Sequence, residues 1–191
     1  ALCCQVDQAY AWQVLGNHGE AERINRRLVW AFAAADRESI DAQFSAVRLL
    51  ANLTAQRRYD ECCDTAEELM ALWPEGSTAT TPSYREFLGQ WTWALEQTGR
   101  VEYAVAMATH VINNTPDDLD GPAAANSHEV RGRHRLAHQQ PAAMQDLARA
   151  SRAHLALGQV ERASDLASLL VQAAAHTHAD AHPARSAPSA A

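Results

Sequence analysis

The sequence predicts an all-α protein built as a short stack of helical hairpins. Alanine is the commonest residue type, while Ile, Val, Phe and Tyr are few, and this composition favours helix over strand. Apolar residues also recur at helical steps along most of the chain. Turn signals divide these periodic segments into pairs at Gly16, Arg57, Gly99 and Gly158.

A chain of 191 residues fits one domain with a single core. Its first hairpin is expected to pair a helix over residues 1–15 with a second helix after a corner at 16–19. The small side chain of Ala21 lets these two helices approach closely. The second hairpin begins after capping residues at 36–39. Pro74 ends it, because proline has no N–H to donate within a helix.

The third hairpin is the most regular unit of the chain. Thr81 and Pro82 are typical of a helix start, as the N-cap and the first helical residue. The chain is expected to turn at Gly99, and the small Ala104 follows five residues later. Pro116 marks the end of the second helix. A glycine corner, a small residue and a final proline therefore define the unit.

The regular pattern is lost after the third hairpin. We expect an insertion over about 117–140 that contains an Arg- and His-rich helix. A last hairpin then turns at Gly158. Residues 176–191 are rich in Ala, His and Pro and have little to bury, so we expect a mobile tail. The helical domain is therefore predicted to span residues 1–175.

The intervals from Gly16 to Arg57 and from Arg57 to Gly99 are almost equal, whereas the interval from Gly99 to Gly158 is markedly longer. The pattern of Gly99, Ala104 and Pro116 resembles the unit of tetratricopeptide-repeat (TPR) proteins, and Arg57 and Cys62 keep the same five-residue spacing. The period is longer than the roughly 34 residues of that family. Longer units resemble those of bacterial regulators, in which the repeats receive a peptide, a small ligand or another domain. The resemblance implies a right-handed α-α superhelix, a TPR-like solenoid of about four hairpins.

The resemblance also implies that the first helix of each hairpin lines an inner concave surface. We expect a protein or peptide partner to bind in this groove, which is mixed, aromatic and mildly acidic. The alternative is that these side chains pack against the insertion or the neighbouring hairpin. The residues expected to line the groove are Tyr10, Gln13, Phe44, Val47, Thr54, Glu86, Trp93, Glu96, Gln97 and Arg152.

The composition excludes several function classes. All sixteen basic residues are Arg, which excludes Schiff-base chemistry and a phosphate-loop lysine. The net charge of -7 argues against direct binding of nucleic acid, because that binding needs a basic face. No apolar run is long enough for a membrane span, and no signal peptide is recognisable. We therefore expect a cytoplasmic protein.

The cysteines and the candidate nucleophiles do not indicate catalysis. The four Cys form two adjacent pairs, Cys3 with Cys4 and Cys62 with Cys63, and not the CxxC spacing of zinc or redox sites. We interpret them as small helix residues in a reducing cytosol. The sequence contains no nucleophile elbow, nucleotide-binding loop or paired-carboxylate site. We predict neither an enzymatic activity nor a cofactor.

Metal binding by the inserted helix is the alternative function. His134 and His138 have the i, i+4 spacing that lets two imidazoles reach one metal ion, and His128 lies one to two turns before them. The competing interpretation is a solvated helix face on which Glu129 pairs with Arg133. A metal-binding enzyme or sensor therefore stays open beside the interaction scaffold.

Taken together, these observations predict an interaction scaffold whose partner is another protein or a peptide. The longer period suggests the sensor or docking part of a cytoplasmic bacterial regulator, and hence a role in transcription regulation. A third hypothesis is a structural subunit that forms homo-oligomers through the exposed ends of its stack.

Overall fold

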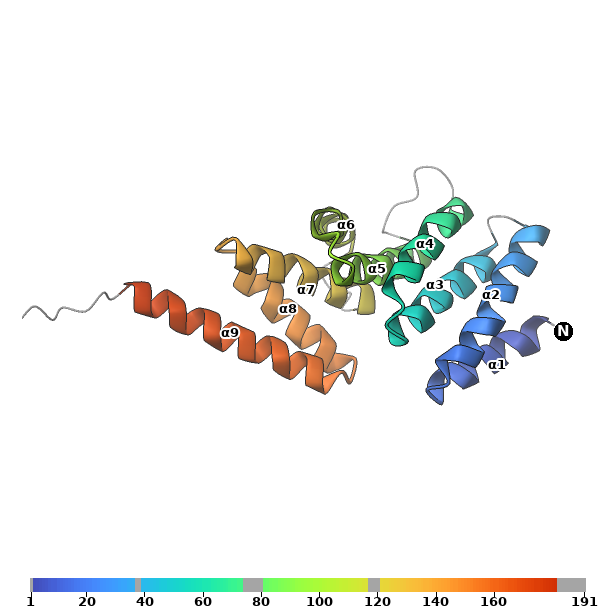
Figure 1. Cartoon of the computed structure of the whole chain (residues 1–191), viewed down its shortest axis with the longest axis horizontal. Coiled ribbons are helices and arrows are strands. Elements are labelled where there is room, and N and C mark those ends of the chain that lie inside the picture. The colour runs from blue at the N-terminus through green and yellow to red at the C-terminus, as the bar shows by residue number, and fades with distance from the viewer. Residues whose placement is uncertain (1, 37–38, 74–80, 117–120, 182–191) are drawn as a thin grey trace, which may run out of the picture.

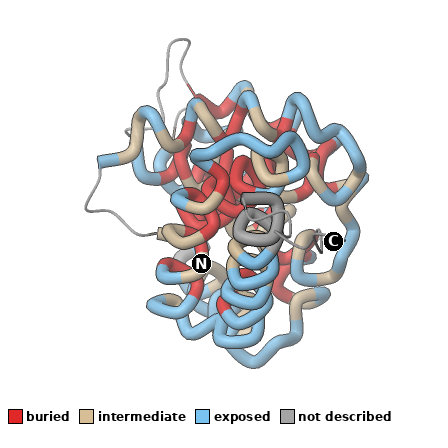
Figure 2. The backbone as a smooth tube through the Cα atoms, turned by 90° about the vertical axis from the view of Figure 1, so that its left-hand side faces the viewer, coloured by how far each residue is buried: buried red, intermediate tan, exposed pale blue. Residues whose placement is uncertain are grey.

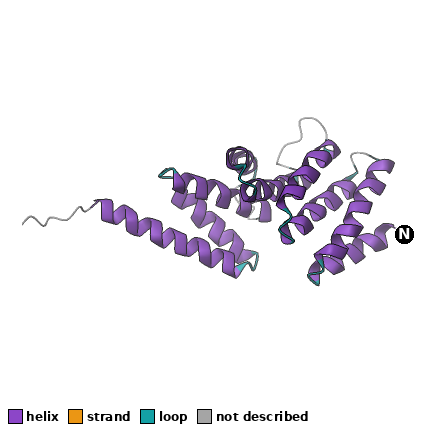
Figure 3. Cartoon of the chain, viewed as in Figure 1, coloured by secondary structure: helices purple, strands orange, loops and turns teal. Residues whose placement is uncertain are grey.

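A computed structural model of the chain describes residues 2–36, 39–73, 81–116 and 121–181. Within these ranges every regular element is a helix (Figure 3). The helices follow one another in an elongated stack, with the N-terminus at one end and α9 at the other (Figure 1). The predicted all-α class, with helices packed in sequential pairs as in TPR-like repeats, is confirmed.

The helix bounds lie close to the expected ones. The first half of the chain forms α1 Leu2–Val14, α2 His18–Ala35, α3 Ile40–Ala55, α4 Tyr59–Leu69 and the short 3-10 helix η1 Met70–Leu72. The second half forms α5 Pro82–Gln97, α6 Val101–Asn113, α7 Pro122–Ala137, α8 Ala143–Ala156 and α9 Val160–Ala181. Local chemistry explains several starts, since Asn17 caps α2 through the N–H of Glu20 and a proline opens both α5 and α7.

The hairpin corners are residues in the left-handed backbone region. Gly16, Gly99 and Gly158 have φ angles of 76°, 80° and 75°, which glycine adopts without a steric penalty. Arg57 has the same role at a φ of 58°. These are the four corners expected from the sequence. A further corner, Gln139 with a φ of 54°, joins α7 to α8.

The corner at Gln139 changes the interpretation of residues 117–140. The interval from Gly99 to Gln139 nearly equals the two intervals before it, so the regular spacing of the corners continues past Gly99. Helix α7 packs against α5, α6 and α8, and it therefore occupies the place of the first helix in a fourth hairpin. The described part of the expected insertion is an integral layer of the stack. The sequence concealed this because a glutamine, and not a glycine, stands at the corner.

The first helices of successive hairpins pack against one another from α3 onward. Helix α3 contacts α5, and α5 contacts α7. The second helices α2, α4 and α6 make no comparable contacts with each other in the described part of the chain. Each of them instead packs against the first helices on either side, as α2 does against α1 and α3. We call the side of the stack formed by the first helices its inner side, and the side formed by the second helices its outer side.

The main hydrophobic core runs through α3, α4, α5 and α6. Its aromatic centre places the ring of Trp73 at 4.3 Å from Phe87 and 5.6 Å from Tyr84, between centroids, and sets Trp91 edge-on to Phe87. Fully buried leucines surround these rings, namely Leu49, Leu50, Leu53, Leu69 and Leu95. Buried residues are concentrated inside the stack, whereas α9, nearest the viewer in Figure 2, is mostly exposed.

The C-terminal boundary differs from the expected one. The backbone of α9 is helical as far as Ala181, whereas the sequence suggested that the helical domain ends at 175. Alanine is abundant in this segment and has the highest helix propensity, which explains the extension. The rest of the expected tail, 182–191, lies outside the described residues. The domain limits otherwise remain a prediction.

Candidate functional site

The expected groove residues lie on first helices, with one exception. They are Tyr10 and Gln13 on α1, Phe44, Val47 and Thr54 on α3, and Glu86, Trp93, Glu96 and Gln97 on α5. Arg152 instead lies on α8, the second helix of its hairpin, which packs against α7 and α9. The sequence placed Arg152 on a first helix because it missed the corner before α8. The structure therefore assigns Arg152 to a different layer of the stack.

Aromatic side chains mark the inner side of the stack. Tyr10 is 56% exposed and Phe44 is 48% exposed, and Trp93 is half-buried. The guanidinium of Arg48 lies over the Tyr10 ring, 5.4 Å from its centroid, and this contact links α3 to α1. Tyr10 and Phe44 therefore present aromatic surface that the hydrophobic core does not use.

Other groove residues contribute to the packing of the stack. The Thr54 hydroxyl donates to Gln90 Oε1 at 3.0 Å, which links α3 to α5. Val47 packs against the main core, so its apolar surface is partly used there. Gln13 is half-buried, and its Oε1 is buried without a hydrogen-bond partner among the described residues. The inner side is thus a mixed surface, with both free and engaged side chains.

The acidic residues of the groove are also engaged. Glu86 accepts a hydrogen bond from the backbone N–H of Ala123 in the first turn of α7, where the helix dipole favours a carboxylate. Burial nevertheless raises the pKa of Glu86. Glu96 accepts a hydrogen bond from the side-chain amide of Gln97. Glu86 therefore positions α7 on α5, a structural role that the sequence did not reveal.

A buried carboxylate, Glu129 of α7, connects the last three helices. It forms ion pairs with Arg133 at 2.8 Å and with Arg162 at 2.6 Å, and its Oε2 lies 2.9 Å from Nε2 of His154. Burial alone would raise the pKa of Glu129, but the hydrogen bond to His154 and the charges of Arg162 and Arg133 hold it below its usual value. The predicted pair of Glu129 with Arg133 is confirmed, but Glu129 is buried and does not lie on a solvated helix face. The partners from α8 and α9 could not be seen in the sequence.

A second buried carboxylate, Asp146, fastens α8 to α7. Arg131 donates to both carboxylate oxygens, Arg135 donates to Oδ2 at 2.6 Å, and Nδ1 of His128 lies 3.0 Å from Oδ1. Burial opposes ionisation, yet the bonds from His128 and Arg131 and the charge of Arg135 lower the pKa of Asp146 well below its usual range. His128, Arg131 and Arg135 have an i, i+3, i+7 spacing, which places them on one face of α7. This spacing was the sequence signal that could have predicted a shared acidic partner.

The candidate metal ligands are not brought together. His128 contacts Asp146, whereas the rings of His134 and His138 lie against each other with centroids 4.2 Å apart. His128 and His134 are spaced so that their side chains turn to different faces of a helix. Over the described ranges, no group of three or more His, Cys, Asp or Glu side chains is placed to hold a metal ion.

The cysteines on α4 occupy packing positions. Cys62 and Cys63 are buried, and burial raises the pKa of both thiols, which makes them poor nucleophiles at neutral pH. Cys62 has the same place relative to its corner as the equally buried Ala21 and Ala104. The interpretation of this pair as small helix residues agrees with the structure.

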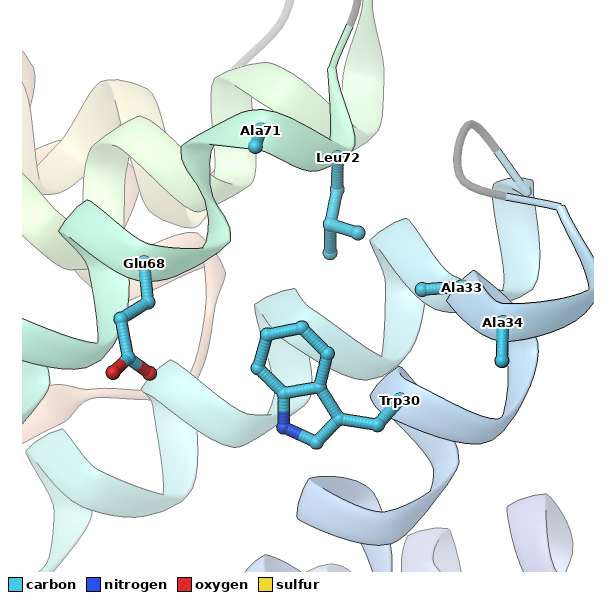
Figure 4. Close-up of a pocket in the computed structure, with 6 residues that line it drawn as sticks. All are labelled: Trp30, Ala33, Ala34, Glu68, Ala71 and Leu72. Atoms are coloured by element: carbon cyan, nitrogen blue, oxygen red, sulfur yellow. The ribbon is translucent and has the colours of Figure 1, made fainter.

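Sequence reasoning did not mark a hollow between α2 and the end of α4. It has a volume of about 380 Å³, and one wall is the indole of Trp30, which is 50% exposed (Figure 4). The other lining residues are Ala33, Ala34, Glu68, Ala71 and Leu72. The hollow lies on the outer side, between the second helices α2 and α4 with the adjoining η1. Trp30 is therefore an exposed aromatic residue away from the inner surface.

The corners and the layered hairpins together define the fold, an all-α stack of helices packed in sequential pairs that matches TPR-like repeat structures. Two solved structures from Podosopora anserina share this arrangement. Both are TPR-like repeats of a protein assigned as a kinesin light chain. One, a single-substitution variant, has a TM-score of 0.60 at 20% sequence identity and covers 93% of this chain and 96% of that chain. The other has a TM-score of 0.59 at 20% sequence identity and covers 92% of this chain and 96% of that chain.

These structural similarities establish the fold and do not indicate a regulator. No protein-family model and no curated protein matches the sequence. In the part of the chain that the structure describes, no helix is both long enough and apolar enough to cross a membrane.

Proposed function

We propose that this chain is a scaffold for binding a protein or peptide, and that the partner docks along the first helices. TPR-like repeats generally mediate protein interactions and are usually not catalytic. The observation that carries the proposal is the exposure of Tyr10 and Phe44 on neighbouring first helices, with Trp93 on the next one.

The chemistry of this surface fits a peptide that uses apolar or aromatic side chains as anchors. Aromatic residues supply much of the binding energy at interfaces, because they bury a large area at a small cost in conformational entropy. Polar groups on the first helices, namely Arg48 over the Tyr10 ring and Gln90 on α5, can hydrogen-bond to the backbone of a partner. The helices already hold these groups in place, so binding requires little rearrangement.

We further propose that the chain is the sensor or docking part of a bacterial regulator of transcription. The even spacing of the corners from Gly16 to Gln139 supports this finer role, because each unit is longer than the roughly 34 residues of an ordinary TPR unit. We also propose a cytoplasmic location, with which the free thiols of Cys4, Cys62 and Cys63 are compatible. The partner would then be a protein or peptide of the same compartment.

A library of random twelve-residue peptides, displayed on phage and selected against the purified chain, tests the binding surface. We expect the selected peptides to lose roughly tenfold in affinity, about 1.4 kcal/mol, when Tyr10 and Phe44 are both replaced by Ala. Fluorescence anisotropy with labelled peptides measures the change. Trp30→Ala is the matched control, because Trp30 is a similarly exposed aromatic residue on the outer side. Peptides that depend on Trp30 and ignore Tyr10 and Phe44 would place the binding surface on the second helices instead.

A further inference from the structure

A polar site built by α5 and α7 holds a guanidinium group. The Cζ atom of Arg162, from the first turn of α9, lies 3.8 Å from the centroid of the Trp93 ring on α5. Its Nε donates to Oε2 of the buried Glu129 on α7 at 2.6 Å. The negative charge of Glu96 is also close enough to favour the charged form of Arg162. An aromatic face and carboxylates are the groups that recognise an arginine side chain.

Arg162 fills this site imperfectly. Its Nη2 is buried and has no hydrogen-bond partner among the described residues. A buried donor without an acceptor is costly compared with the same group in water. Burial also lowers the pKa of Arg162, although Glu129 opposes this change. The guanidinium of Arg162 therefore lacks one hydrogen bond in this site. An arginine from a partner peptide can gain that bond, because a carbonyl group of the same peptide can accept it.

The helix that carries Arg162 is lightly held. Among the described side chains of α9, only Ala163 and Leu166 are buried hydrophobic residues, and the exposed fractions of Val160 and Val171 are 60% and 70%. Helix α9 packs mainly on α8, at the end of the stack. Moving its first turn would leave the main core of α3 to α6 intact, because that core contains no residue of α9.

We propose that Trp93, Glu129 and Glu96 form a binding site for an arginine side chain of the partner, and that Arg162 is its built-in competitor. The inference rests on the proposed function, because Trp93 lies on a first helix, as Tyr10 and Phe44 do. It adds the chemistry of the partner, a peptide segment that contains arginine. The interaction of Arg162 with Trp93 and Glu129 shows which chemical group the site accepts.

Short peptides of matched composition test this site. The probe is the acetylated and amidated peptide Gly-Ser-Arg-Gly-Ser, compared with the same peptide carrying citrulline, which has the shape of arginine without its charge. NMR titration of the Trp93 indole N–H, assigned with a Trp93→Phe variant, measures binding. We expect Arg162→Gln to bind the arginine peptide about fivefold more tightly than the natural chain, because the competitor has been removed. The citrulline peptide should bind weakly to both.

Further variants distinguish a specific arginine site from a general effect of charge. Trp93→Ala combined with Arg162→Gln should abolish the gain, and Arg27→Gln, an exposed arginine on α2, should leave the affinity unchanged. Arg162→Lys is a milder change at the same position. It should give a gain, because lysine lacks the planar group that stacks on the ring, but a smaller one than Arg162→Gln, because lysine keeps the positive charge. Thermal melting confirms that each variant is folded. If Arg162→Gln unfolds the chain, the lysine variant decides the question.

Equal affinity of the arginine peptide for the natural chain and the position-162 variants would overturn the inference, as would equal binding of the citrulline peptide. This result would not affect the proposed function if the selected twelve-residue peptides still depend on Tyr10 and Phe44. Conversely, loss of that dependence alone would refute the peptide-binding surface and leave the arginine site to be judged by its own titration.

Discussion

The middle and the end of this stack are held together in different ways. Helices α3 to α6 share a core of leucines and aromatic rings in which Phe87 is completely buried. Among the described residues, helices α7 to α9 share a small apolar cluster of their own around Leu147 and Leu166. Two buried carboxylates, Glu129 and Asp146, join these helices through arginine and histidine. The stability of α3 to α6, the apolar half, thus depends on buried apolar area. The stability of α7 to α9, the end of the stack, depends on paired charges.

This difference has consequences for stability. The free energy gained by burying apolar surface does not depend on pH or on the orientation of the contacting groups. The stability of the middle of the stack should therefore depend little on pH. A buried ion pair is stable only while both partners are present, charged and correctly placed. The end of the stack should therefore respond to pH and to single charge changes. The proposed competitor Arg162 belongs to this responsive half.

The largest effect is expected in the apolar half. Phe87→Ala removes a fully buried ring that contacts Trp73 and Trp91, and we expect a loss of about 4 kcal/mol in the free energy of unfolding. Urea denaturation at pH 5 and pH 7 measures it. The loss should be similar at both pH values, because no ionisable group is removed. A strongly pH-dependent loss would contradict the assignment of this half to apolar packing.

A smaller loss, of about 3 kcal/mol, is expected for Asp146→Ala, because it leaves Arg131 and Arg135 without their shared carboxylate. Hydrogen exchange should show that the loss is greatest in α7 and α8 and small in α3 and α4. Asp146→Asn keeps the shape and removes the charge, so it is the matched control for packing. Equal exchange rates throughout the chain would mean that the two halves unfold as one unit.

The pH dependence of the end of the stack follows from the same carboxylates. The folded-state pKa values of Asp146 and Glu129 are both lowered, so their stabilising contribution is complete above the unfolded pKa values of about 3.9 and 4.3. It is lost as the pH falls from there toward the folded pKa values. Exchange protection in α7 to α9 should therefore decline below about pH 4, before that of the apolar half. Asp146→Asn should reduce this decline.

The smallest effect concerns the corner between α7 and α8. Gln139 has a φ of 54°, a conformation that glycine adopts without the steric cost of a side chain. We expect Gln139→Gly to stabilise the folded chain by about 0.5 kcal/mol, since the relief of backbone strain is offset in part by the greater freedom of glycine in the unfolded state. Thermal melting detects the change. Gly158→Ala is the reverse control and should destabilise the folded chain. If both substitutions raise the melting temperature, relief of backbone strain does not explain the effect of Gln139→Gly.

Much of the apolar half could be predicted from the sequence. Periodicity located its helices, and the corners at Arg57 and Gly99 and the small residues Cys62 and Ala104 occupy the expected places. The same register also placed Tyr10 and Phe44 on first helices, where both side chains are exposed. The end of the stack was predicted less well, because its corner lacks glycine and its interior is polar. Arg152 was consequently placed on the wrong kind of helix.

By itself, the sequence determined the helical class and most of the hairpin corners. These features depend on interactions within a few residues, namely the helical spacing of apolar side chains and the freedom of glycine at positive φ. Only the tertiary structure decided that α7 is a layer of the stack and that Glu129 meets Arg162 and His154. Those outcomes depend on contacts between residues 25 and 33 positions apart in the chain, which no local pattern specifies.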